Sequence, residues 1–205
     1  MNINQIMVLN RALDGEDIYG LPSFTREPIS SIQIELVKND LCRMGVLNSH
    51  TTFTNEGAAL TRKIQDYKAA KKYIHFNHMI IALINDVKAI VMKQNNEDIS
   101  FTTVVTENFL EQLSHVYKFL LMDSESEHSK TSHCTLKEIF LKYKIKPYNS
   151  FTLKTNKKDE SLITNELFFE SKRQLYVFQS DNNELTSMSS KDVREMLRER
   201  LRVLC

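Results

Sequence analysis

The stretch Tyr73–Gln94, YIHFNHMIIALINDVKAIVMKQ, decides the fold of this chain. Before it, apolar residues recur at the three- and four-residue steps of helices, and within it they crowd into runs rich in isoleucine and valine. Asn85-Asp86 interrupts the runs, which predicts two long strands joined by a two-residue turn. A third β-branched run, ISFTTVVT at residues 99–106, predicts a strand and completes a meander of three antiparallel strands.

Helical patterns flank this meander on both sides. Upstream, three helices are predicted from their apolar periodicity, at residues 2–13, 30–45 and 54–72. Downstream, the pattern predicts helices and strands in the order helix 106–121, helix 136–143, strands 161–170, 173–179 and 184–187, and a last helix from Ser189. Runs of consecutive strands favour an α+β fold, with a central antiparallel sheet formed by the meander and the C-terminal strands and flanked by helices.

The length fits one domain. Its parts are a helical region 1–72, the sheet and helix of 73–122, a polar loop 123–134 and the C-terminal strands and helix of 135–205. The loop, DSESEHSKTSHC, has almost no apolar content, and we expect it to be mobile.

Composition excludes several classes of function. The 27 Lys and Arg balance 26 Asp and Glu, whereas a chain dedicated to nucleic acid needs a basic surplus. The four glycines stand apart, so no phosphate-binding loop is expected. The longest uncharged run, Tyr73–Asn85, is shorter than the ~20 apolar residues that span a bilayer. We expect no leader and no membrane insertion, and three distant cysteines predict reduced thiols in the cytoplasm.

Neither metal chemistry nor catalysis has a clear signature. His75 and His78 lie three apart on a predicted strand and would point to opposite faces. His128, His133 and Cys134 lie in the polar loop without a local fourth ligand. Nucleophile motifs are absent, so the sequence predicts no catalytic, cofactor-binding or metal-binding residue.

Two surfaces remain open to interpretation. If Tyr73–Ile84 is one strand, Met79 and Ile81 share a face with His75 and Asn77. Either helices cover both faces of the sheet, or part of this face docks another polypeptide. In the last helix, four arginines alternate with glutamates, which favours a solvated face over a patch for an acidic partner.

Element order and size suggest a family. The segments NQIMVLNRALDGEDI, MGVLN, FTNEGAAL and TENFLEQLSHVYKFLL, together with the meander, resemble the EspG-like fold of type VII (ESX) secretion chaperones, particularly the EsaE-type proteins. The resemblance covers nearly the whole chain and rests on no short motif.

This resemblance implies a cytoplasmic, non-enzymatic chaperone or adaptor without a cofactor. It would bind the apolar, helical targeting region of a secreted toxin and deliver it to the membrane ATPase of the secretion machinery. It would lie peripherally at the membrane through that machinery, without inserting into the bilayer, and would not bind nucleic acid. We extend the docking surface to the open sheet face and the last helix, at His75, Asn77, Met79, Ile81, Lys88, Met92, Leu197, Leu201 and Leu204.

Two alternatives stay open. One is a winged-helix DNA-binding regulator, whose outline is matched by Leu41, Gly45, Leu47, Thr54 and Gly57. Against it, the five residues between Leu47 and Phe53 are too few for two wing strands and their turn. The other alternative is an enzyme without a recognisable motif.

Overall fold

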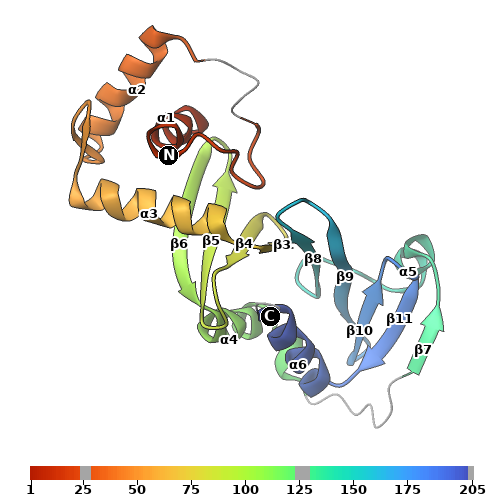
Figure 1. Cartoon of the computed structure of the whole chain (residues 1–205). Helices are drawn as coiled ribbons and strands as arrows, with labels where there is room; N and C mark the ends of the chain where they lie inside the picture. The colour runs from red at the N-terminus through yellow and green to blue at the C-terminus, as the bar shows by residue number, and fades with distance from the viewer. Residues whose placement is uncertain (24–28, 123–129, 203–205) are drawn as a thin grey trace. The chain divides into compact units, whose positions relative to one another are not determined.

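The computed structural model describes residues 1–23, 29–122 and 130–202, which form an α+β fold (Figure 1). Two compact units divide the chain: Met1–Ala70 with Ile90–Thr103, and Lys71–Ala89 with Val104–Cys205. In the described part of the chain, nine strands are hydrogen-bonded in the order β6-β5-β4-β3-β8-β9-β10-β11-β7. The predicted central antiparallel sheet with flanking helices is therefore confirmed.

The first unit is mainly helical. Its helices begin at side-chain caps, with capping boxes at Asn2 and Ser30 and a Thr54 cap that accepts from the Gly57 N–H. Its elements are α1 (Ile3–Leu13), α2 (Ser31–Arg43), β1 (Leu47–Ser49), β2 (Thr52–Phe53), α3 (Asn55–Ala69), and most of β5 (Lys88–Asn95) and β6 (Asp98–Val105).

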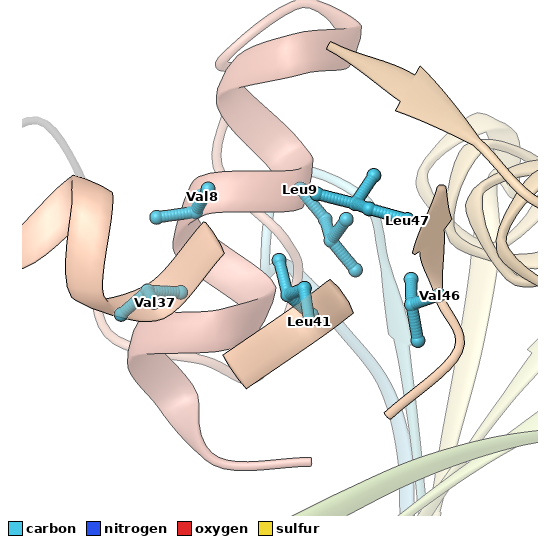
Figure 2. Packing of buried hydrophobic residues seen from close by; sticks show 6 residues of the cluster. All are labelled: Val8, Leu9, Val37, Leu41, Val46 and Leu47. Carbon is cyan, nitrogen blue, oxygen red and sulfur yellow. The ribbon is translucent and has the colours of Figure 1, made fainter. Parts of the chain in front are cut away.

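Apolar side chains from α1, α2 and the start of β1 form one core of this unit, as Figure 2 shows. Leu9 and Leu41 are almost completely buried there, and full burial of such a side chain stabilises by roughly 1.5–3 kcal/mol. Gly57 lets α3 pack closely against the backbone at Val46, because a Cβ at this position would clash with the Val46 carbonyl. The cluster consists of Val8, Leu9, Val37, Leu41, Val46 and Leu47.

A two-stranded hairpin separates α2 from α3. β1 and β2 pair antiparallel, with Leu47 opposite Phe53 and Ser49 opposite Thr52. The expectation that this segment is too short for two strands and their turn was wrong, because a two-residue connection suffices. Its His50 ring lies 2.9 Å from both Glu35 Oε2 and Asn39 Oδ1 on α2.

The second unit holds most of the sheet. Its strands are β3 (Lys72–Phe76), β4 (Met79–Leu83), β7 (Lys130–His133), β8 (Ser150–Lys157), β9 (Leu162–Ser171), β10 (Gln174–Gln179) and β11 (Glu184–Met188). Its helices are α4 (Thr106–Val116), the 3-10 helix η1 (Lys118–Leu121), α5 (Leu136–Lys142) and α6 (Ser190–Arg200).

The prediction of one long strand over Tyr73–Ile84 was wrong. The chain reverses at Asn77-His78, so β3 and β4 form a hairpin with Phe76 opposite Met79. Asn77 has a φ of 52°, a left-handed conformation that asparagine tolerates better than most residues. Its Nδ2 donates to the Tyr117 hydroxyl at 2.9 Å. The meander therefore has four strands.

Helices cover both faces of this part of the sheet. On one face, an aromatic cluster joins the sheet to α4 and η1. It consists of Phe76, Phe151 and Phe168 of the sheet, Phe109 of α4, Tyr117 at the end of α4 and Phe119 of η1. On the other face, Ile139 of α5 packs against Leu167, Phe169, Phe178 and Leu185. The sequence left open whether helices cover both faces of the sheet or one face docks another polypeptide. In the second unit, helices cover both faces.

Besides β1 and β2, two strands of the nine-stranded sheet lie where none was predicted. Lys130–His133 of the predicted mobile loop 123–134 forms edge strand β7, which pairs with β11. Residues 123–129 of that loop, including His128, lie outside the described residues. The other strand is β8, which joins β3 to β9 through ladders on both sides.

Candidate functional site

The hairpin at Asn77 separates the residues that we expected on one exposed face. Opposite residues of an antiparallel pair share a face, so His75 lies with Ile80, its partner. Met79 and Ile81 lie on the other face, with their partners Phe76 and Ile74. Asn77 lies in the turn and is exposed. The prediction that these residues share one face of the sheet was wrong, because the turn reverses the alternation.

The individual environments of these residues also differ. Ile81 is buried at 1 % exposure, whereas Met79 is half-buried. His75 is half-buried opposite Lys154 of β8; burial, and then the Lys154 charge, lower the pKa of its imidazole, while Glu160 opposes them. On β5, Lys88 is half-buried in the second unit and Met92 is buried in the first.

The last helix is packed inward, which removes its leucines from the exposed surface. Leu197 and Leu201 are 1 % and 4 % exposed, and Leu204 lies outside the described residues. The other side of α6 borders a groove, and this groove is the stronger candidate site.

The groove lies between α4 and α6, the green and the dark-blue helix that lie side by side in Figure 1. It encloses about 370 Å³. Its apolar lining comes from Leu110 of α4, Leu121 of η1 and Leu197 of α6, of which Leu121 is half exposed. Among the described residues of the predicted docking surface, Leu197 alone lines it.

Opposite charges line the two sides of the groove. Glu107 and Glu111 belong to α4, whereas Arg194 and Arg198 belong to α6. Arg198 Nη2 lies 3.5 Å from Glu107 Oε1, so one pair spans the groove. Glu111 and Arg194 form no ion pair with a described residue and remain available to a partner. Ser114 and His115 add polar groups on the α4 side.

The sequence positions α4 firmly at this place. Leu113 is buried, and Phe109 stacks edge-on against Phe76 of β3 with ring centroids 6.0 Å apart. Thr106 ties the first turn down: its N–H donates to the Val87 carbonyl and its hydroxyl to the Asp86 carbonyl. The sequence also suggests Thr106 as the cap of this helix, which is wrong, because its side chain bonds outside the helix and no side-chain cap is formed.

A buried charge network fixes the other wall. Arg200 donates from Nε to Glu166 Oε2 at 3.1 Å and from Nη2 to Glu166 Oε1 at 2.6 Å. Glu166 is 1 % exposed, and its carboxylate raises the pKa of Arg200. Lys72 Nζ donates to the Arg200 and Arg202 carbonyls at 2.6 and 2.8 Å, which caps the negative end of the helix dipole.

The described residues contain neither a group of side chains suited to a metal ion nor a membrane-spanning helix. Within residues 1–23, 29–122 and 130–202, no cluster of three or more His, Cys, Asp and Glu side chains could hold a metal ion. In the same part of the chain, no helix combines the length and the apolar character needed to cross a membrane.

A family model covers residues 1–204, and its description is a domain of unknown function, DUF5081. The chain belongs to the DUF5081 family. No curated protein matches the sequence.

Sequence reasoning found only part of this DUF5081 site. The arginines of the last helix were singled out, but their acidic counterparts on α4 lie some 90 residues earlier in the chain, as the separation of 91 between Glu107 and Arg198 shows. The links of Lys72 to α6 and of Glu166 to Arg200 also join residues far apart in the chain, at separations of 128 and 34. For the second link the sequence offers one signal, a glutamate directly before the apolar run LFF of residues 167–169, where burial is expected.

Proposed function

We propose that this DUF5081 chain is a chaperone or adaptor of a type VII secretion system that binds the helical targeting region of a secreted toxin in the α4–α6 groove. The observation that carries the proposal is the chemistry of the groove: a leucine lining between glutamates of α4 and arginines of α6. An amphipathic partner helix would place its apolar stripe on the leucines, as in other helix-in-groove complexes.

The charges define the partner helix further. Basic side chains along one border of its apolar stripe would face Glu111, and acidic side chains along the other border would face Arg194. Such an arrangement fixes the orientation of a helix and rejects one with the opposite pattern. Stoichiometric binding without turnover follows from this role, as does delivery of the complex to the membrane ATPase from the cytoplasm, which the family resemblance implies.

The first experiment is affinity purification of the tagged chain from its native cytoplasm, followed by mass spectrometry and size-exclusion chromatography. We expect a secreted-type polypeptide in a stoichiometric complex. A synthetic peptide of that polypeptide's helical targeting region should then bind the purified chain and compete with the full-length partner.

Charge-reversed variants of the groove test whether the peptide binds there. Glu111→Arg with Arg194→Glu should weaken peptide binding about tenfold or more, because both borders of the stripe then meet like charges. The matched control is Glu56→Arg with Arg62→Glu on α3, which exchanges the same charge types outside the groove. Equal loss in both variants would exclude the groove as the site. Absence of any stoichiometric secreted partner would overturn the proposed function itself.

One observation favours a second candidate function, a winged-helix DNA-binding regulator. The first unit has the order helix α2, hairpin β1–β2 and helix α3, which matches part of the outline of that fold. This candidate requires duplex DNA binding through the first unit, which fluorescence anisotropy with a labelled duplex and a variant of His50 can detect.

A further inference from the structure

Helix α5 is anchored by its inner side. Ile139 is 1 % exposed and packs against four apolar side chains of the sheet. The Tyr143 ring, directly after the helix, lies 5.1 Å from the Phe169 ring and 5.0 Å from the Tyr176 ring. These contacts fix α5 on the sheet, and the opposite side of the helix faces away from the sheet.

The segment that follows is also ordered. Asn149 Nδ2 donates to the Lys144 and Glu170 carbonyls, both at 3.0 Å, and Asn149 Oδ1 accepts from the Lys146 N–H at 2.6 Å. Ser150 Oγ donates to the Lys146 carbonyl at 2.8 Å. These bonds hold residues 144–150 against β9, so α5 and this turn form one continuous surface.

Large apolar side chains project from this surface. Leu136 and Phe140 are 44 % and 56 % exposed, and Leu141 and Tyr148 reach 79 % and 77 %. Side chains with three quarters of their area exposed stand out from the protein. A rigid protein partner would need pockets to receive them.

Lysines surround these apolar side chains. Residues 136–148, LKEIFLKYKIKPY, hold four lysines against one glutamate, a net charge of +3 in a chain whose total is +1. The Glu138 carboxylate is engaged in the capping box of α5, where it accepts from the Thr135 N–H at 2.6 Å. None of the four lysines forms an ion pair with a described residue. They are Lys137, Lys142, Lys144 and Lys146.

We infer that the α5 surface, residues 136–148, binds the surface of an anionic lipid bilayer. Bulky apolar side chains combined with lysines are the features of segments that lie at the bilayer interface, where the lysines meet anionic headgroups. Tyrosine is enriched at the same depth. A deformable bilayer accepts protruding side chains without preformed pockets, which favours lipid over an acidic protein surface. This inference does not depend on the proposed toxin-binding role.

Vesicle co-sedimentation of the full-length chain tests the inference. The probes are vesicles of phosphatidylcholine alone and vesicles with about 30 mol % phosphatidylglycerol, at about 50 and 500 mM NaCl. We expect binding to the anionic vesicles at low salt, and much weaker binding to the neutral vesicles and at high salt. Absence of binding to anionic vesicles at low salt, or equal binding to both compositions, would overturn the inference.

Two variants then assign the binding to this surface. Lys137→Gln, Lys144→Gln and Lys146→Gln together should weaken partitioning about a hundredfold, since each lysine contributes about a factor of five. Phe140→Ser with Leu141→Ser should weaken it about tenfold or more, because the apolar contribution is lost.

The matched control is Ile32→Ser with Leu36→Ser, which removes two exposed apolar side chains from α2. It should bind as the unchanged chain does, and circular dichroism should confirm that all variants stay folded. Unchanged vesicle binding in either α5 variant would overturn the inference. So would loss of vesicle binding by the control alone. Retention on a polyglutamate surface without vesicle binding would assign the patch to an acidic protein instead.

Discussion

Lys72 is the residue whose charge state bears most directly on stability. It is 6 % exposed, and its ammonium donates to two carbonyls at the C-terminal end of α6. Burial, and then the nearby Arg200 charge, lower the pKa of Lys72 to about 8. The unfolded chain keeps the ordinary pKa near 10.5.

Stability should therefore rise with pH through this residue. Between about pH 8 and 10.5 the unfolded chain binds more protons at Lys72 than the folded chain, so the free energy of unfolding increases with pH in this window. Urea titrations at successive pH values measure it. Lys72→Met removes this contribution, so the difference in slope between the two proteins isolates it from tyrosine and cysteine titration. If the free energy of unfolding depends on pH equally in both proteins, then the two carbonyls keep Lys72 protonated across the window.

At the residue scale, the sequence alone predicts caps better than it predicts burial partners. Ser189 and Thr54, at the predicted starts of their helices, cap them, because a cap depends on residues three positions apart. Lys72 and Glu166 carry no local signal of their partners, since those partners lie 128 and 34 residues away. Local patterns specify local bonds, and the charge network that fixes α6 is not local.

At the scale of elements, the Glu166–Arg200 pair decides how α6 is attached to β9. Arg200→Leu leaves a carboxylate buried without a counterion, and we expect a loss of about 3–5 kcal/mol in the free energy of unfolding. The double variant Glu166→Leu/Arg200→Leu should lose clearly less than Arg200→Leu alone, because no uncompensated charge is left. Urea unfolding of the single and double variants measures both.

Arg198→Leu provides the control on the same helix. Its pair with Glu107 is about half exposed, so removal should cost less than about 1 kcal/mol. If the double variant is as unstable as the sum of its single variants, then the pair is not coupled and α6 is held by Val193, Leu197 and Leu201 alone.

Element types were predicted well and their breaks were not. The helices, the α+β class and the strands after residue 161 follow from periodicity, which a buried face imposes on every element. The turn at Asn77-His78 was missed because the flanking runs are apolar on both faces, so no change of alternation marks it. β8 was missed because SFTLKTNK alternates with many polar residues, and only pairing with β3 and β9 reveals it as a strand.

At the scale of the whole molecule, the distribution of charge matters more than its total. A net charge of +1 conceals +3 on residues 136–148, which leaves the rest of the chain negative. By comparison, α2 has no net charge and α3 has a net charge of +1. The candidate groove adds no net charge, because its two glutamates offset its two arginines.

DNA binding is therefore expected to be weak and confined to the α5 surface. Fluorescence anisotropy with a labelled duplex at about 50 and 200 mM NaCl should show nonspecific binding that higher salt removes, because few phosphates are neutralised. The lysine variant of the α5 surface should abolish even this binding, whereas His50→Ala, at the tip of the β1–β2 hairpin, should not change it. Binding that persists at the higher salt and in the lysine variant, and is lost in His50→Ala, would instead favour the winged-helix regulator, because the DNA contact would then lie in the first unit.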